Sequence, residues 1–206
     1  MFNKKNIMKD VFHLFDPHFQ KHHKSPNVEI EFRLGKRSNG FFDTNVGEEI
    51  FNQCKQALDK CNQWESVTEK EYEIYSTNSG RRTIIDQDDT RTHEYKKKID
   101  KIDFSDHSFP FDIRMGISSE IPIPEDELNE EDVFDDVKTK KRFSYLRKGL
   151  RIDISIVTGN PDDLDDENDT AYQVEFEIVD PSSVQTRDAL YNHIYKIKDL
   201  FKCLKL

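Results

Sequence analysis

The chain has 206 residues, enough for one domain of ordinary size and too few for two comfortable ones. Charged residues make up 35% and hydrophobic residues 34%, and the excess of acids over bases, 41 to 31, gives a formal net charge of −10. This charge argues against a protein that coats duplex DNA or an anionic membrane, although it is compatible with a local basic pocket. The three cysteines form no C-x-x-C pair, which excludes a disulfide framework and a cysteine-rich zinc site. With no run of 18 apolar residues, no membrane span is expected, and we expect a soluble intracellular protein.

In chain order, the first predicted element is a helix over residues 6–21, which Pro17 is expected to end or kink. A strand over 28–34 follows, because apolar and charged residues alternate there. A second helix is predicted over 47–61, where apolar residues form one stripe. Further strands are predicted over 67–76, 81–86, 95–104, 112–121, 138–145, 150–157 and 172–179. The last segment, 184–206, has the periodicity of a helix that packs one face on the body.

Two segments between the strands are strongly acidic. Residues 124–136 carry eight acids in thirteen positions, and residues 161–169 carry six in nine. We interpret both as solvated loops. The second lacks the sixth-position glycine and the closing glutamate of an EF-hand, so a calcium loop of that kind is excluded. The sequence also has no P-loop, no G-x-G-x-x-G and no G-x-S-x-G motif.

Charged residues recur in one phase of several predicted strands, and a strand directs alternate side chains to opposite faces. The first and last strands carry acids in this phase, at Glu29, Glu31, Glu175 and Glu177. Strands between them carry cations in one phase, at Arg114, Lys138, Lys140, Arg142 and Arg151. A single such strand usually has a charged side in water, and a half-exposed β domain without a tunnel is the simplest alternative. The whole set predicts a closed barrel with its charged phase inside and its apolar phase covered by helices.

Such a lumen suits a polyphosphate together with a divalent metal. Clustered carboxylates bind hard cations such as Mg²⁺ or Mn²⁺, and Lys and Arg neutralise phosphate oxygens. A metal there would polarise the terminal phosphoryl group, and a glutamate would orient or deprotonate the attacking water. Because isolated buried charges are costly, the signs must balance and the lumen must be wet.

Seven short motifs, in this order along the chain, resemble those of a known enzyme family. They are V-E-I-E-F-R-L-G-K (28–36), R-T-I-I-D (82–86), K-K-K-I (96–99), D-I-R-M-G-I-S-S-E-I-P-I-P (112–124), K-K-R-F-S-Y (140–145), R-I-D-I-S (151–155) and V-E-F-E-I (174–178). The set is similar to the metal-dependent RNA 5′-triphosphatases of fungi, protozoa and large DNA viruses. These belong to the triphosphate tunnel metalloenzymes and perform the first step of mRNA capping. One departure is Gln173, where the family often has a third alternating glutamate.

The resemblance implies an α+β fold in which a closed eight-stranded antiparallel barrel with a charged lumen is flanked by about three helices. It also implies a single domain over 1–206, with an N-terminal helix in 1–25, a barrel over 26–180 that carries the helix 47–61, and a C-terminal helix over 184–206.

The resemblance assigns roles to individual residues. The implied metal ligands are Glu29, Glu31, Glu175 and Glu177. The implied phosphate-binding residues are Arg82, Lys96, Arg114, Lys140, Arg142 and Arg151. Glu120 is expected to position or activate water, and Glu175, Arg114 and Arg142 are expected to act in catalysis beside it. Asp153 is expected to orient a neighbouring cation, and Arg81 and Lys98 remain alternatives to Arg82 and Lys96.

The implied reaction converts triphosphate-ended RNA to diphosphate-ended RNA and phosphate with Mg²⁺ or Mn²⁺, and free NTPs are further expected substrates. The chain has no K-x-D-G motif, so a separate guanylyltransferase partner is expected, with no membrane and no duplex DNA as partners. We expect it in the cytoplasm or nucleus, including a viral factory or virion. Two alternatives stay open: an inorganic tripolyphosphatase or general NTPase of the same fold, and a non-catalytic phosphate-binding subunit of a capping complex.

Overall fold

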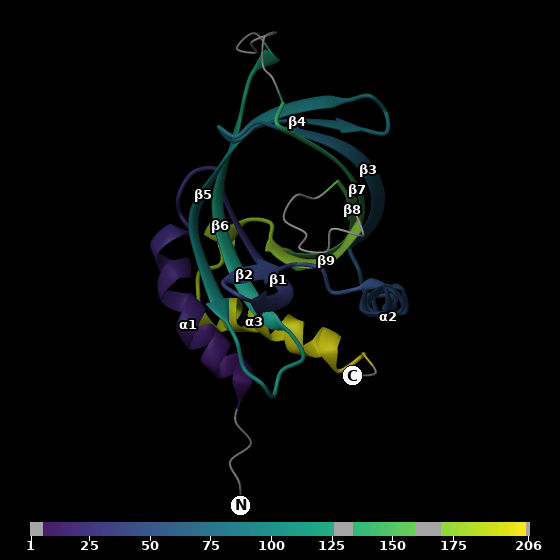
Figure 1. Ribbon diagram of the computed structural model, residues 1–206. Coiled ribbons are helices and arrows are strands. Elements are labelled where there is room, and N and C mark those ends of the chain that lie inside the picture. The colour runs from purple at the N-terminus through teal and green to yellow at the C-terminus, as the bar shows by residue number, and fades with distance from the viewer. Residues whose placement is uncertain (1–5, 126–133, 160–169, 205–206) are drawn as a thin grey trace, which may run out of the picture.

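The computed structural model describes residues 6–125, 134–159 and 170–204 (Figure 1). Most of the two acidic segments, and with them the expectation of solvated loops there, lies outside the described residues. One antiparallel sheet is central to the described ranges. Its strands are β1 (Val28–Ser38), β2 (Phe41–Asp43), β3 (Ser66–Ser76), β4 (Arg81–Asp86), β5 (Arg91–Phe104), β6 (Asp112–Pro122), β7 (Asp136–Arg147), β8 (Leu150–Thr158) and β9 (Thr170–Ile178).

The sheet closes into a barrel because its first and last strands pair. The strand order is β2-β1-β6-β5-β4-β3-β7-β8-β9, and an additional antiparallel pairing joins β1 to β9. Figure 1 shows the strands curving around a common centre. The eight strands other than β2 form the closed barrel, as predicted, while β2 extends β1 as a short hairpin that the sequence pattern did not indicate.

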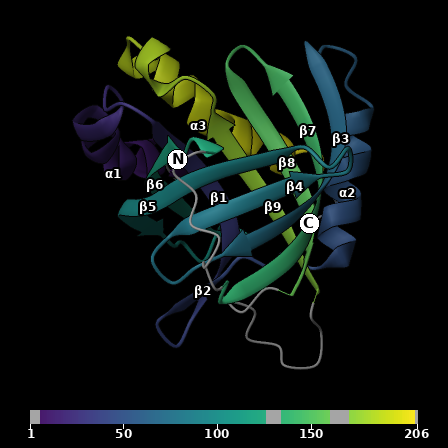
Figure 2. The same cartoon turned by 90° about the horizontal axis from the view of Figure 1, so that it is seen from above.

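Three helices lie against the outside of the barrel within the described part of the chain. They are α1 (Ile7–His22), α2 (Glu48–Asp59) and α3 (Arg187–Phe201), and a 3-10 turn, η2 (Pro181–Ser183), precedes α3. In Figures 1 and 2, α1 and α3 lie together on one side and α2 lies on another.

Two helix boundaries differ from the predictions. The helix α1 does not end at Pro17 but continues to His22, because Phe19 beyond the proline is fully buried and anchors the last turn. The C-terminal helix begins only at Arg187, where the Thr186 side chain accepts a hydrogen bond from the backbone N–H of Ala189.

The main hydrophobic core lies between the barrel wall and the helices, outside the lumen. The outward phase of β1 contributes Ile30, Phe32 and Leu34, all fully buried. Phe15 of α1 stacks on Phe32 with ring centroids 5.8 Å apart. The helix α2 packs on another part of the wall, where the ring centroid of its Phe51 lies 6.2 Å from that of Phe143 on β7. The predicted inversion, with apolar residues outside and charged residues inside, is confirmed.

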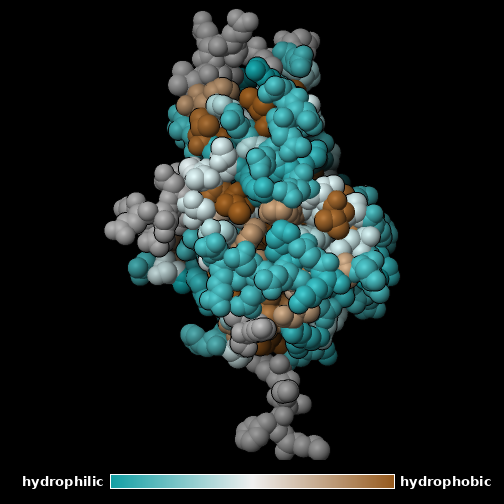
Figure 3. Space-filling model, turned by 90° about the vertical axis from the view of Figure 1, so that its right-hand side faces the viewer, coloured by the Kyte–Doolittle hydropathy of each residue, from teal (hydrophilic) through white to brown (hydrophobic). Residues whose placement is uncertain are grey.

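Figure 3 shows one face that is largely hydrophilic, with separate hydrophobic areas. Among the described helices, none has the length and apolar character needed to cross a membrane.

The core position of Phe32 generates a stability prediction. Phe32→Ala leaves a cavity between β1 and α1, so we expect it to lower the free energy of unfolding by about 3–5 kcal/mol. The matched control is Phe41→Ala on β2, whose side chain is 62% exposed, and its expected effect is within about 0.5 kcal/mol. Urea denaturation in the presence of chelator measures both, and equal losses would contradict this account of the core.

Candidate active site

The pairing of β1 with β9 joins the two glutamate-rich strands from opposite ends of the chain. Glu31 lies opposite Glu177, and Arg33 lies opposite Glu175. On its other side, β1 pairs with β6 so that Glu31 faces Gly116. A Cβ atom at Gly116 would lie only 3.2 Å from Oε1 of Glu31, so glycine leaves space for this carboxylate. The closure of the barrel thus gathers the four implied metal ligands on one wall.

A first group of ion pairs forms around Glu175, which is 4% exposed. The Nε atom of Arg33 lies 2.8 Å from Glu31 and 3.0 Å from Glu175. On the opposite side, Nζ of Lys140 lies 3.1 Å from Glu175. Two implied metal ligands are therefore bridged by one arginine. Arg33 shares the charged phase of β1, but the sequence reasoning gave it no role.

A second group centres on Lys96. Its ammonium contacts Glu29 and lies 2.7 Å from Glu120. The Ser118 hydroxyl donates a 2.7 Å hydrogen bond to Glu29, a contact that the sequence reasoning did not include. Next to this group, Arg82 lies 3.3 Å from Glu94 and 4.0 Å from Glu120. Of the alternatives, Arg82 and Lys96 both contact the lumen acids, while the Lys98 side chain is exposed.

A third group surrounds Asp153, which is 1% exposed. Its carboxylate lies 2.9 Å from Nε of Arg151 and 3.7 Å from Nη1 of Arg142. Arg151 also contacts Glu177. Asp153 thus forms ion pairs with two of the implied phosphate-binding arginines.

The pKa values of the lumen groups reflect the balance between burial and pairing. Burial opposes the ionisation of Glu29, but Lys96 and Ser118 outweigh it and lower its pKa to about 2. For Glu177, burial outweighs Arg151, and the nearby negative Glu29 and Asp153 add to it, raising the pKa to about 8. Burial likewise raises the pKa values of Glu31 and Glu120. Burial lowers the pKa of Lys140 to about 8, although Glu175 opposes this shift.

The carboxylate oxygens of the four glutamates are suitable ligands for a hard divalent cation. Their side chains do not converge on a single point in this structure. Within the described ranges, no three Asp, Glu, His or Cys side chains already converge as metal ligands. Arg33, Lys96 and Arg151 form ion pairs with these carboxylates. Burial raises the pKa of Glu177, and the nearby negative Glu29 and Asp153 add to this shift. Carboxylate oxygens are the donors that hard cations such as Mg²⁺ or Mn²⁺ prefer, so the residue types fit such an ion.

Arg114, an implied phosphate-binding residue, has other partners. Asp103 binds its guanidinium through two hydrogen bonds, and the ring of Phe42 lies 4.2 Å from its Cζ atom. Neither Asp103 nor Phe42 was found by sequence reasoning. Asp103 is preceded by a bulge in β5 that alternation cannot show, and Phe42 lies on the unpredicted β2.

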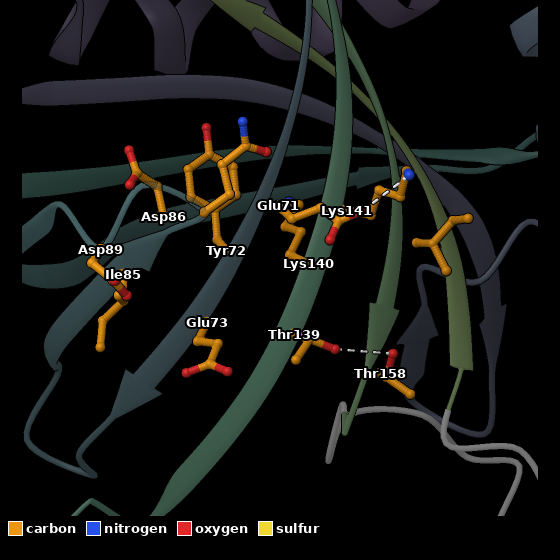
Figure 4. Close-up of a pocket in the computed structure, with 12 residues that line it drawn as sticks. Glu71, Tyr72, Glu73, Ile85, Asp86, Asp89, Thr139, Lys140, Lys141 and Thr158 are labelled. Atoms are coloured by element: carbon orange, nitrogen blue, oxygen red, sulfur yellow. Dashed lines mark hydrogen bonds and ion pairs between the residues drawn. The ribbon is translucent and has the colours of Figure 1, made fainter.

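A cavity of about 430 Å³ lies against β3, β4, β7 and β8, and Lys140 of the lumen is among the residues that line it (Figure 4). Most of its lining belongs to the outward phase of the strands, including Glu71, Glu73 and Lys141. In Figure 4, Glu71 and Lys141 lie side by side, and their charged atoms are 3.0 Å apart. With acids predominating in its lining, this cavity is not suited to a triphosphate.

Comparison with known proteins gives one consistent family. The family described as mRNA capping enzyme, beta chain, matches residues 13–203. The chain is 27% identical over 161 residues to the 5′RNA triphosphatase A449R of Paramecium bursaria Chlorella virus 1, which covers 78% of this chain and 79% of that protein.

Two solved structures share the fold. The Pct1 RNA triphosphatase of S. pombe matches with a TM-score of 0.73 at 16% identity, over 96% of this chain and 91% of Pct1. The Mimivirus capping enzyme triphosphatase matches with a TM-score of 0.65 at 12% identity, over 96% of this chain and 98% of that one.

The raised pKa of Glu177 predicts a pH dependence of stability in chelator. A carboxyl whose pKa rises from 4.5 to about 8 on folding stabilises the fold fully below about pH 4.5, and this stabilisation is lost as the pH rises through about 8. Between about pH 5 and 9, we therefore expect the free energy of unfolding to fall relative to that of Glu177→Gln. At about 1.4 kcal/mol per pKa unit, the difference is on the order of 4 kcal/mol.

Chemical denaturation across the pH series measures this difference. Glu48→Gln, at the exposed start of α2, is the control and should follow wild type. Parallel curves for wild type and Glu177→Gln would show that Glu177 is ionised throughout.

Proposed function

Since the chain belongs to the family of mRNA capping enzyme beta chains, it is an RNA 5′-triphosphatase, and we propose how its tunnel performs the reaction. Water attacks the γ-phosphorus of triphosphate-ended RNA, the bond from the γ-phosphorus to the bridging oxygen breaks, and diphosphate-ended RNA leaves with inorganic phosphate as the other product. The observation that carries the proposal is the closure of β1 onto β9, which brings Glu31 opposite Glu177 and surrounds both with cations.

Capping triphosphatases of this tunnel type depend on a metal ion as a class. Here the proposed ion is Mg²⁺ or Mn²⁺, and the proposed ligands are Glu29, Glu31, Glu175 and Glu177. When bound, such an ion supplies Lewis-acid polarisation of a phosphoryl oxygen.

The protein's own groups supply orientation and charge. Glu120 orients the water and accepts its proton, and its raised pKa makes it a better base than an ordinary carboxylate. Arg82, Lys96 and Lys140 neutralise the phosphate chain together with the two arginines that Asp153 orients. Arginine offers a planar fork to phosphate oxygens, so fixing its plane in advance reduces the cost of binding.

The ion pairs of the lumen suggest that the carboxylates exchange their cationic side chains for a metal ion when ligands bind. Arg33 bridges Glu31 and Glu175, so it occupies the position between two proposed ligands. If these carboxylates held a divalent cation, Arg33, Lys96 and Arg151 would be free to contact phosphate instead. Metal and triphosphate therefore each favour the binding of the other, which is a coupling between two sites.

We further propose a range of substrates and the partners of the protein. The lumen groups recognise phosphates and a metal, so free NTPs with Mn²⁺ and inorganic tripolyphosphate are compatible alternative substrates. A non-catalytic subunit is less favoured, because all four proposed ligands are glutamates in the lumen phase. We also propose that one tunnel domain spans the chain, that a separate guanylyltransferase completes the cap, and that the protein acts in the cytoplasm or nucleus.

Removing the charge of Glu31 should abolish the activity. Glu31→Gln keeps the size of the side chain but removes a proposed ligand, so phosphate release should fall at least about 100-fold. The measurement is release from γ-labelled triphosphate-ended RNA with Mg²⁺, with Mn²⁺ and with chelator. Glu71→Gln, on the outward phase of β3, should keep wild-type activity. Full metal-dependent turnover by Glu31→Gln would overturn the assignment of the site.

The same assay separates the alternatives. A kcat/KM value higher for RNA than for tripolyphosphate and ATP is the expected result for a capping enzyme. The reverse order would favour a general tripolyphosphatase, and no release by a folded wild-type protein would favour the non-catalytic subunit.

The exchange of partners predicts that loss of Arg33 lowers the stability of the protein in chelator but increases its stabilisation by Mn²⁺. In chelator, Arg33→Gln leaves two buried carboxylates without their bridging cation and should cost about 3 kcal/mol of unfolding free energy. Mn²⁺ replaces the missing charge, so it should raise the Tm of this variant more than that of wild type. Arg37→Gln, in the same phase but at the exposed end of β1, is the matched control. An equal Mn²⁺ response in all three proteins would contradict the exchange.

A further inference from the structure

A bulge in β5 changes which of its side chains face the tunnel. Before the bulge, Lys96 pairs with Glu120 and Lys98 with Ser118, so even-numbered residues share the lumen phase. The register shifts between Lys98 and Asp100, and beyond it Asp103 pairs with Arg114. One extra residue thus moves odd-numbered side chains to the lumen phase. Without the bulge, Asp103 would point away from the lumen.

Asp103 fixes Arg114 in a bidentate pair. The Nε and Nη2 atoms of Arg114 donate to the two oxygens of Asp103 over 2.7 and 2.9 Å. Both side chains are largely buried, with exposed fractions of 15% for Asp103 and 20% for Arg114. A planar fork of this kind sets the plane of the guanidinium as well as its position.

Phe42 holds the face of the same guanidinium. Its ring lies 4.2 Å from Cζ of Arg114, within the range of a cation–π contact. The ring fits here because β1 has glycine at position 35: a Cβ on Gly35 would lie 2.5 Å from the Phe42 ring and 2.1 Å from the carbonyl oxygen of Asp43. Arg114 is thus restrained at its edge by Asp103 and on its face by Phe42.

This restraint has a consequence for the lumen. Arg114 lies directly opposite Arg33, the arginine that bridges Glu31 and Glu175. An Arg114 without a partner would repel Arg33 and compete for the same carboxylates. Asp103 neutralises it and keeps it apart from them. Since the pair uses Nε and one N–H of Nη2, the Nη1 edge keeps two N–H groups with which to meet a phosphate oxygen.

We propose that Asp103 and Phe42 are positioning residues that fix Arg114 for contact with the phosphate chain at this end of the tunnel. This inference rests on the proposed function, because it assigns Arg114 to the triphosphate. Arg114 contacts phosphate in the bound substrate and in the transition state alike, so losing its orientation should act mainly on KM.

The test is a double-mutant cycle with Asp103→Asn and Arg114→Lys. An amide keeps the size of Asp103 but cannot accept both N–H groups, and lysine cannot form the fork. Asp103→Asn should raise KM for triphosphate-ended RNA about tenfold and change kcat less than about twofold. In the Arg114→Lys background it should have no further effect, because Asp103 acts through Arg114. Phe42→Leu should behave in the same way with a smaller effect, and Asp88→Asn, in the exposed β4–β5 turn, is the control.

A binding measurement that does not depend on turnover accompanies the kinetics. Inorganic tripolyphosphate is titrated calorimetrically into each variant in chelator, where Asp103→Asn should weaken binding by a similar factor. A wild-type KM for Asp103→Asn, with or without a lowered Tm, would overturn the proposal, as would an equal effect of Asp103→Asn in both backgrounds. If wild type released no phosphate from RNA, the proposed function would fail. The positioning role would fail separately, if Asp103→Asn bound tripolyphosphate as tightly as wild type.

Discussion

The structure depends on the pairing of β1 with β9, which closes a sheet whose inner face is charged. Once the barrel is closed, each carboxylate and each cation in the lumen loses much of its contact with water and must be paired. The groups around Glu175, Lys96 and Asp153 meet this requirement by alternating acids and bases across neighbouring strands. The same alternation places the proposed metal ligands beside the proposed phosphate-binding cations, so the ion pairs that offset burial are also the candidate active site.

The charged lumen forces the hydrophobic core to the outside of the barrel. Residues of β1 such as Ile30 and Phe32 have no apolar interior to enter, and they are buried only because α1 and α3 cover them. α2 performs the same role over Phe143 and Tyr172. A chain with only 34% hydrophobic residues can fold in this way because the helices are needed only where the outward phase is apolar.

The ion pairs that offset burial in the lumen also bear on how the tunnel can bind ligands. Arg33, Lys96 and Arg151 contact carboxylates that we propose as metal ligands, so under that proposal metal and phosphate would bind by exchange of partners. Arg114 is different, because Asp103 binds it without serving as one of the proposed ligands. The tunnel therefore contains cations paired with proposed metal ligands and one, Arg114, that is paired with a different acid.

The sequence by itself determined the eight barrel strands, the three helices to within a few residues and the charged phase of most strands, because the periods of 2 and 3.6 residues are local properties of the backbone. The order of the motifs added the candidate residues of the site. Only the tertiary structure decided which of them meet. The closure that sets Glu31 opposite Glu177 joins residues more than a hundred positions apart, and Arg33 gains its bridging role only through that closure. Asp103 reaches the lumen through one extra residue in β5, which shifts the alternation on which sequence reasoning relies. Phe42 reaches Arg114 through a hairpin whose three-residue strand is too short to have a period.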